Sequence, residues 1–294
     1  MDEILLKNQM WASCMFIYRN LNYDGTLKEN YTLNPYFENI KYTGDIYPFV
    51  GGIMGINAGI IGHTDDGIII TFRGTRSKFN NGIGDLTQSV LDWINTFSSV
   101  KVCFRPFGDG KVFKSFFNSL NSISEILDKA ITLIPEDSSN FTIYLTGHSK
   151  GGVMAVLFAR LLEYKLFEKG IKMPTLRITT FGTPKIGTKS FKVEYENFLE
   201  KFSIKYNRYE SFYDIFPHIP LPLAEKSLLS KISLKLRLLC KLMPDGDFYS
   251  PGDLKMLSYD SLDSSNFSKD SFKEITKFLK KDSKIIFKGH KDYE

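Results

Sequence analysis

The feature that most constrains the fold is a serine placed between a β-rich run and an apolar helical run. Residues 141–146 have the composition of a buried strand, and Lys150 to Glu168, rich in Val, Ala, Leu and Phe, is typical of a buried helix. Between them lies Gly147-His148-Ser149-Lys150-Gly151, a G-x-S-x-G pattern. In such a strand-to-helix turn the glycines avoid steric clashes, and the helix N-terminus lies behind the exposed serine hydroxyl. The pattern predicts Ser149 as a nucleophile; the alternative is a plain structural turn.

The order of the remaining elements predicts an α/β fold. Strands are expected at 176–181 and 203–209, and a hairpin of 51–63 with 67–73 around an Asp-Gly turn. Helices are expected at 4–18 and 112–134, with a polar loop running to about Pro48. Strands that alternate with helices are typical of a mostly parallel central sheet with helices on both faces. We find no repeats and no low-complexity linker, and therefore expect residues 1–294 to form a single domain.

Composition excludes several other classes of protein. The chain has 294 residues, 43% of them hydrophobic, which excludes disorder. Only eight of its 38 Lys and Arg residues are Arg, which disfavours nucleic-acid binding. Three scattered cysteines predict neither a disulfide framework nor a metal site. An acidic start and the lack of any eighteen-residue apolar run lead us to expect a cytoplasmic location.

Several blocks of sequence resemble the class 3 (fungal-type) lipase family, a branch of the α/β-hydrolases. The blocks occur in the family's order and span about Gly51 to Pro220, with a weaker tail near His290. They are 69–75 (Ile-Ile-Thr-Phe-Arg-Gly-Thr), 92–94 (Asp-Trp-Ile), 147–152, 181–187 (Phe-Gly-Thr-Pro-Lys-Ile-Gly) and 214–220 (Asp-Ile-Phe-Pro-His-Ile-Pro). The chain departs from the family pattern in two places, one a single residue and the other a short block. Lys150 replaces a small or apolar residue, which would alter substrate charge preference, and 112–116 replaces a His-x-Gly-Phe block.

A serine nucleophile needs a base and a carboxylate that orients it. Of the four histidines, His290 comes last and follows both the serine and the proposed acid, in the α/β-hydrolase order Ser, Asp, His, with Tyr293 close behind. His218, in a Pro-bounded loop, is the alternative base, whereas His63 is expected at a hairpin rim and His148 is expected to point away from Ser149. By resemblance the acid is Asp214, because it opens the Asp-x-x-Pro-x-x-Pro block. Rival carboxylates lie in turns: Asp245, Asp247, Asp253 and Asp260.

The resemblance also implies the remaining site residues and the reaction. The oxyanion hole is expected from the backbone N–H of Thr75, assisted by its hydroxyl, and the N–H of Lys150. The implied activity is hydrolysis of lipid carboxylic esters through an acyl-enzyme, without metal or other cofactor. The alternatives are a phospholipase A or lysophospholipase with the same triad, and a non-catalytic lipid-binding relative.

Two segments are candidates for contact with lipid. The polar stretch 76–91 occupies the family's lid position but is equally interpretable as a surface loop. In 221–243 a Leu-rich face accompanies five basic residues and Glu225, a net +4, which is typical of an interfacial helix, although part of the run alternates like a strand. We expect 221–247 to be an insertion near the cleft mouth, and expect the chain to contact a peripheral membrane or lipid-droplet surface. The other interpretation is a helix packed on the core with a solvated basic face.

Overall fold

The computed structural model describes residues 2–22, 24–52, 57–75, 101–104, 108–211, 214, 216–221, 226–227, 230–231, 240 and 247–257. Three expectations lie wholly or largely outside these ranges: the base His290, the segment 76–91, and most of 221–247. The domain boundaries therefore stay a prediction.

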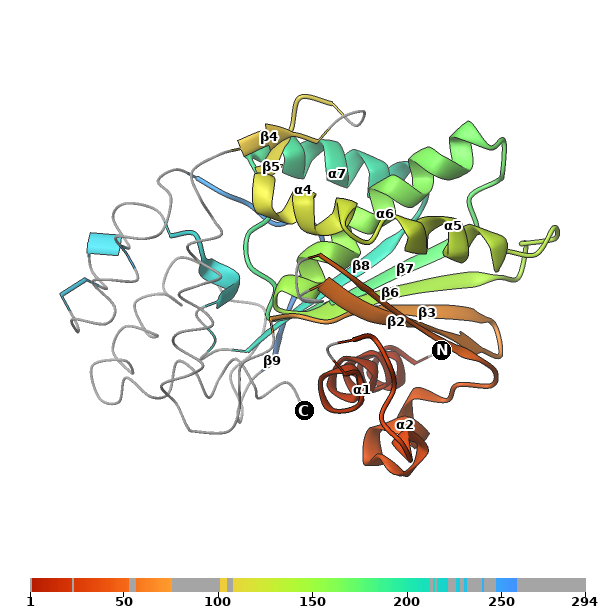
Figure 1. Ribbon diagram of the computed structural model, residues 1–294. Coiled ribbons are helices and arrows are strands. Elements are labelled where there is room, and N and C mark those ends of the chain that lie inside the picture. Colours follow the sequence, from red (N-terminus) through yellow and green to blue (C-terminus); the bar gives the residue numbers. More distant parts are fainter. Residues whose placement is uncertain are drawn as a thin grey trace.

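The described residues form a central seven-stranded sheet in the order β1-β2-β3-β6-β7-β8-β9 (Figure 1). β1, β2 and β3 pair antiparallel, and each pair from β3 onward is parallel. The strands are β1 (Ile46–Gly51), β2 (Asn57–Thr64), β3 (Gly67–Phe72), β6 (Thr142–His148), β7 (Thr175–Phe181), β8 (Lys205–Ser211) and β9 (Asp253–Leu257). A mostly parallel sheet is confirmed.

Helices cover both faces of the sheet (Figure 1). On one face lie α4 (Lys114–Asn121), α5 (Glu125–Thr132), α6 (Lys150–Glu168) and α7 (Lys189–Lys201). On the other lie α1 (Glu3–Asn20) and α2 (Pro35–Ile40). Each layer has its own apolar core, the larger one beneath α6 and the smaller one beneath α1. Strands buried on both faces read as continuous apolar runs, as in Ile68-Ile69-Ile70 of β3.

Two sequence-based predictions were wrong in detail. The helix expected at 112–134 is a short strand, β5 (Lys111–Phe113), followed by α4 and α5. β5 pairs with β4 (Lys101–Cys103), and the two helices are separated at Ser122, whose hydroxyl donates to the Ser119 carbonyl. Serine hydroxyls that bind the backbone in this way interrupt helices. The expected loop up to Pro48 contains a 3₁₀ turn (Tyr31–Leu33), α2 and the start of β1.

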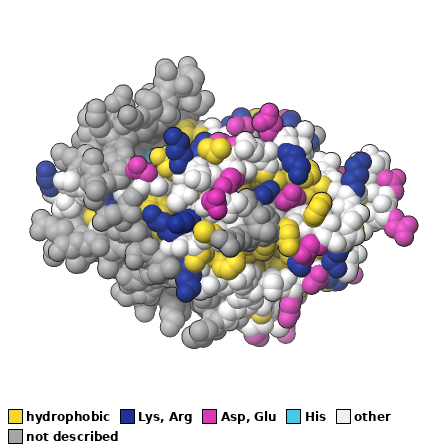
Figure 2. All heavy atoms as spheres, turned by 90° about the horizontal axis from the view of Figure 1, so that it is seen from above, with side chains coloured by type: hydrophobic (Ala, Val, Ile, Leu, Met, Phe, Trp, Pro, Cys, Tyr) yellow, Lys and Arg dark blue, Asp and Glu magenta, His cyan; other side chains and the backbone are white. Residues whose placement is uncertain are grey.

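Charges of both signs are interspersed over the described part of the α4–α7 face, with no single basic patch (Figure 2). Several of them form ion pairs within the helices, such as Arg160–Glu163 and Lys165–Glu168 in α6. None of the described helices meets the combination of length and hydropathy that a bilayer-crossing helix needs.

Candidate functional site

Ser149 lies in the sharp turn that joins β6 to α6. It is a non-glycine residue at φ 58°, ψ −127°, outside the regions that L-residues usually occupy. The flanking glycines permit this turn. A Cβ at Gly147 would lie 2.2 Å from the carbonyl carbon of Gly151, and a Cβ at Gly151 would lie 2.1 Å from the carbonyl oxygen of Phe72. The predicted strand–serine–helix arrangement is present, and backbone strain of this kind is characteristic of functional sites.

The segment after β3 lies directly against Ser149. A Cβ at Gly74 would come within 3.3 Å of the Ser149 Cβ and 2.5 Å of the His148 carbonyl oxygen. Thr75 follows Gly74, and Lys150 is the first residue of α6. The two segments that carry the predicted oxyanion amides therefore meet at the serine.

The side chain of Lys150 is buried instead of reaching solvent. Its exposed fraction is 8%, and Nζ donates to Asn57 Oδ1 over 2.6 Å. Burial, reinforced by the positive charge of Arg73, lowers the pKa of Lys150 to about 8. Because the side chain is directed at Asn57, at the start of β2, the structure gives no support to the expected effect on substrate charge preference.

His148 points to the opposite face of the sheet, beneath α1, as expected. Its Nδ1 lies 3.2 Å from the hydroxyl of Tyr18, and its ring meets those of Trp11 and Tyr18 edge to face. The Tyr18 hydroxyl also lies against Gly74, where a Cβ would come within 2.1 Å of it. Tyr18 therefore connects the turn before the nucleophile to the segment before Thr75, a role that sequence reasoning missed.

Asp214 lies at the same edge of the sheet as Ser149. It follows β8, which β7 separates from β6, and the carboxyl ends of these parallel strands share one edge. Its carboxylate is fully buried, and Oδ1 accepts a hydrogen bond from the Phe216 N–H at 2.9 Å. A buried carboxylate held by a backbone amide in this way is suited to orienting a base. Of the rival carboxylates, Asp247 and Asp253 are exposed, and Asp253 begins β9 instead of lying in the expected turn. Asp245 and Asp260 lie outside the described residues.

The other two described histidines differ in their distance from the edge of the sheet that carries Ser149 and Asp214. His63 pairs in register with Ile68 near the start of β3, at the opposite edge of the sheet, where it contacts the Tyr47 ring. His218 ends the 3₁₀ turn that follows Asp214. Burial lowers the pKa of His218, partly opposed by the negative charges of Glu210 and Asp214. His218 is thus near the candidate acid and stays the alternative to His290.

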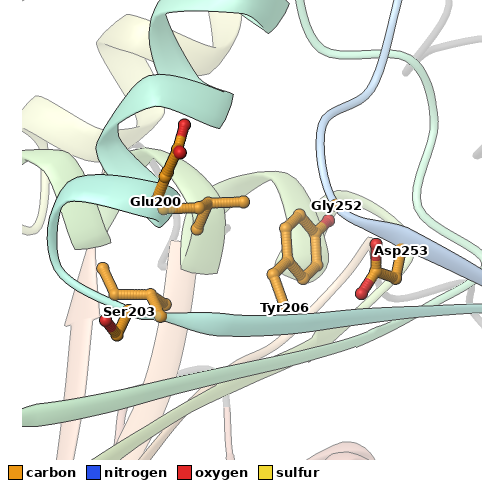
Figure 3. A pocket seen from close by; sticks show the side chains of 7 residues that line it. Glu200, Ser203, Tyr206, Gly252 and Asp253 are labelled. Carbon is orange, nitrogen blue, oxygen red and sulfur yellow. The ribbon is translucent and has the colours of Figure 1, made fainter.

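A pocket of about 270 Å³ lies away from the edge of the sheet that carries Ser149 and Asp214 (Figure 3). It is bounded by the end of α7 and the starts of β8 and β9, with Glu200, Ser203, Tyr206, Gly252 and Asp253 labelled in Figure 3. Because β8 and β9 are parallel to β6, this is the amino edge of the sheet. The pocket is therefore separate from the Ser149 site.

Within the described ranges, no group of three or more His, Cys, Asp or Glu side chains is arranged to hold a metal ion. Hydrolysis without metal or other cofactor stays a prediction from the sequence.

Comparison with known proteins identifies the family. The family model for lipase (class 3) matches residues 69–224, more than half of the chain. A lipase of Rhizomucor miehei is 28% identical over 159 residues, which are 54% of this chain and 39% of the relative. The chloroplastic phospholipase A1-Igamma2 of Arabidopsis thaliana is 30% identical over 111 residues, covering 35% of this chain and 20% of that protein. The matches thus span well under half of these curated relatives.

The fold agrees with that assignment. The crystal structure of a lipase from Rhizopus microsporus var. chinensis superposes with a TM-score of 0.55 at 18% identity, covering 93% of this chain and 82% of that one. The central sheet and its helical layers are therefore those of an α/β-hydrolase. The chain belongs to the class 3 lipase family.

Proposed function

We propose that this chain is a serine hydrolase that cleaves carboxylic esters of lipids through an acyl-enzyme. The observation that carries the proposal is the strained turn at Ser149, with α6 beginning immediately behind it and the Gly74–Thr75 backbone against its side chain. The family assignment supports the same chemistry.

In the proposed reaction Ser149 Oγ attacks the ester carbonyl carbon while His290 accepts the hydroxyl proton. Asp214 orients His290. The N–H groups of Thr75 and Lys150 bind the oxyanion of the tetrahedral intermediate, and each such donor lowers the barrier by about 3 kcal/mol. The C–O bond to the alcohol then breaks, and His290 protonates the departing alkoxide. Water, deprotonated by His290, hydrolyses the acyl-enzyme to release the acid and restore Ser149.

A panel of substrates distinguishes this function from its alternatives. We expect turnover of a soluble short-chain ester and of acylglycerols, measured by release of fatty acid. Release of fatty acid only from diacyl phospholipids or lysophospholipids would favour a phospholipase A or lysophospholipase. The specific support for that alternative is the similarity to the Arabidopsis phospholipase. Binding of lipid without release of any acyl group would indicate a non-catalytic relative and contradict the proposal.

We propose that 221–243 brings the chain to lipid surfaces. The support is its sequence: a Leu-rich face with a net charge of +4 between the proposed acid and base. The structure modifies one detail, since Lys226, expected on the basic face, is buried, whereas Lys231 is exposed.

A cytoplasmic location, peripheral to membranes, is part of the same proposal. It is supported by three cysteines that the structure describes as free, and cell fractionation tests it.

Changing Lys231, Lys235, Arg237 and Lys241 to Gln should weaken binding to anionic vesicles at least severalfold while leaving soluble-ester turnover unchanged. Each basic side chain near an anionic surface contributes about 1 kcal/mol of attraction, screened by salt. Vesicle co-sedimentation at low and high salt measures the effect. The matched control removes the same charge from exposed lysines elsewhere (Lys28, Lys41, Lys172 and Lys189 to Gln). If both variants bind as the wild type does, 221–243 is not the contact with lipid.

A further inference from the structure

A lysine is buried immediately after the candidate nucleophile, where the family pattern has a small or apolar residue. Lys150 is 8% exposed, and its Nζ donates to Asn57 Oδ1, a neutral acceptor. Transferring an ammonium group from water into a protein interior is unfavourable unless a strong partner compensates. Among the described residues, the charge that shifts the pKa of Lys150 is that of Arg73, and that interaction is repulsive. This cation is therefore not explained by stability alone.

The contacts of Asn57 lead from Lys150 to the second predicted oxyanion donor. Asn57 is the first residue of β2, and the next residue, Ala58, accepts a hydrogen bond from the Arg73 N–H over 2.7 Å. Arg73 begins the short segment that continues through Gly74 to Thr75. Asn57 Nδ2 in turn donates to the Ser122 hydroxyl over 2.8 Å. This hydrogen bond fixes the side-chain amide of Asn57, at the start of β2, against the end of α4.

The position of the charge follows from covalent geometry. Lys150 supplies one predicted oxyanion donor with its own backbone N–H. Its Nζ lies no more than about 7 Å from that N–H, because a lysine side chain reaches no farther. A positive charge at this range in a water-poor environment favours negative charge that develops at the amide.

We propose that Lys150 is a positioning residue of the hydrolytic site: its ammonium, bound to Asn57, holds the segment carrying the Thr75 amide in place relative to the Lys150 amide and favours negative charge beside both. The inference rests on the proposed function. The two amides bind the oxyanion more strongly than the ground-state carbonyl, so loss of the ammonium lowers kcat much more than it changes KM.

The first test compares Lys150→Met with the wild type on a soluble short-chain ester. We expect kcat to fall at least tenfold and KM to stay within twofold. Lys165→Met, which removes an exposed lysine from the same helix, is the control and should match the wild type. A Lys150→Met enzyme whose kcat stays within twofold of the wild type overturns the proposal.

The second test uses pH. The described groups that act on the Lys150 ammonium are Asn57, which is neutral and contacts the Ser122 hydroxyl, and Arg73, whose guanidinium stays charged throughout the range tested. The kcat of the wild type should therefore decline above about pH 8 as Lys150 loses its proton. Asn57→Asp places a carboxylate against the ammonium and should move this alkaline decline upward by about one pH unit or more. Ser122→Ala removes the other contact of Asn57 and should leave the decline in place. If Asn57→Asp does not move the decline, the proposal is wrong even where Lys150→Met fails to fold.

Unfolding free energies provide a readout that needs no activity. The pKa of Lys150 is lower in the folded chain than the ordinary 10.5, so the unfolded chain binds more protons between about pH 8 and 10.5. The stability of the wild type relative to Lys150→Met should therefore rise with pH across that range, and a flat difference contradicts the buried ammonium. A wild type that shows this rise but hydrolyses no ester overturns the proposed function instead. A wild type that hydrolyses esters with Lys150→Met as active overturns only this inference.

Discussion

Replacing Ser149 with Ala should reduce the kcat for a soluble short-chain ester by at least about 10³-fold, because the covalent route needs the hydroxyl oxygen. The fold should be retained. The Ser149 side chain makes no hydrogen bond that caps α6, and its backbone N–H, which donates to the Phe181 carbonyl, is unaffected by the substitution. Alanine at φ 58° is strained as serine is, so the melting temperature should change by no more than about 2 °C.

The measurement is ester hydrolysis next to circular dichroism and thermal unfolding of both proteins. Ser211→Ala is a suitable control, because Ser211 is a buried serine at the end of β8, a strand of the same sheet. It should keep most of the activity. More than a few per cent of wild-type turnover in a folded Ser149→Ala protein would exclude Ser149 as the nucleophile.

Loss of His290 should be as damaging as loss of Ser149. Removing residues 290–294, or changing His290 to Ala, takes away the proposed base, so kcat should fall by about 10³-fold or more. Kinetics on the same ester measure it, and the intact fold is checked by thermal unfolding.

His218→Ala is the decisive comparison for the base. His218 ends the 3₁₀ turn Phe216–His218, which follows Asp214 in the chain, and burial lowers the pKa of His218. We expect this variant to keep at least a tenth of the activity. If instead the truncated protein works and His218→Ala does not, His218 is the base and the assignment of His290 is wrong.

The sequence predicted the centre of the fold well because its signals there are local. β6, the turn at Ser149 and α6 follow one another without interruption, and α6 spans Lys150–Glu168 as expected. The antiparallel pairing of β2 with β3 follows from the Asp-Gly turn between them. β1 was missed because it is a half-exposed edge strand interrupted by Pro48, a residue that edge strands tolerate and central strands do not.

The parts of the site that sequence could not predict are contacts between distant segments. The Lys150–Asn57 hydrogen bond joins residues 93 positions apart, and nothing near Asn57 marks it as a partner. Tyr18 reaches His148 from a helix 130 positions away. Such contacts depend on how α1, β2 and α6 pack on the sheet, which periodicity does not specify. The sequence shows that residue 150 is a lysine, but it does not show where the side chain of Lys150 points.

The most direct test of the central claim is to trap the acyl-enzyme mimic on the wild-type chain. Incubation with a fluorophosphonate, which reacts with an activated serine hydroxyl, followed by peptide mass spectrometry identifies the modified residue. The account predicts one phosphonylated site, Ser149, in the peptide that joins β6 to α6, with loss of ester hydrolysis in proportion to labelling. An adduct on another serine that accounts for the loss of activity, or active hydrolysis with Ser149 unlabelled, would contradict it.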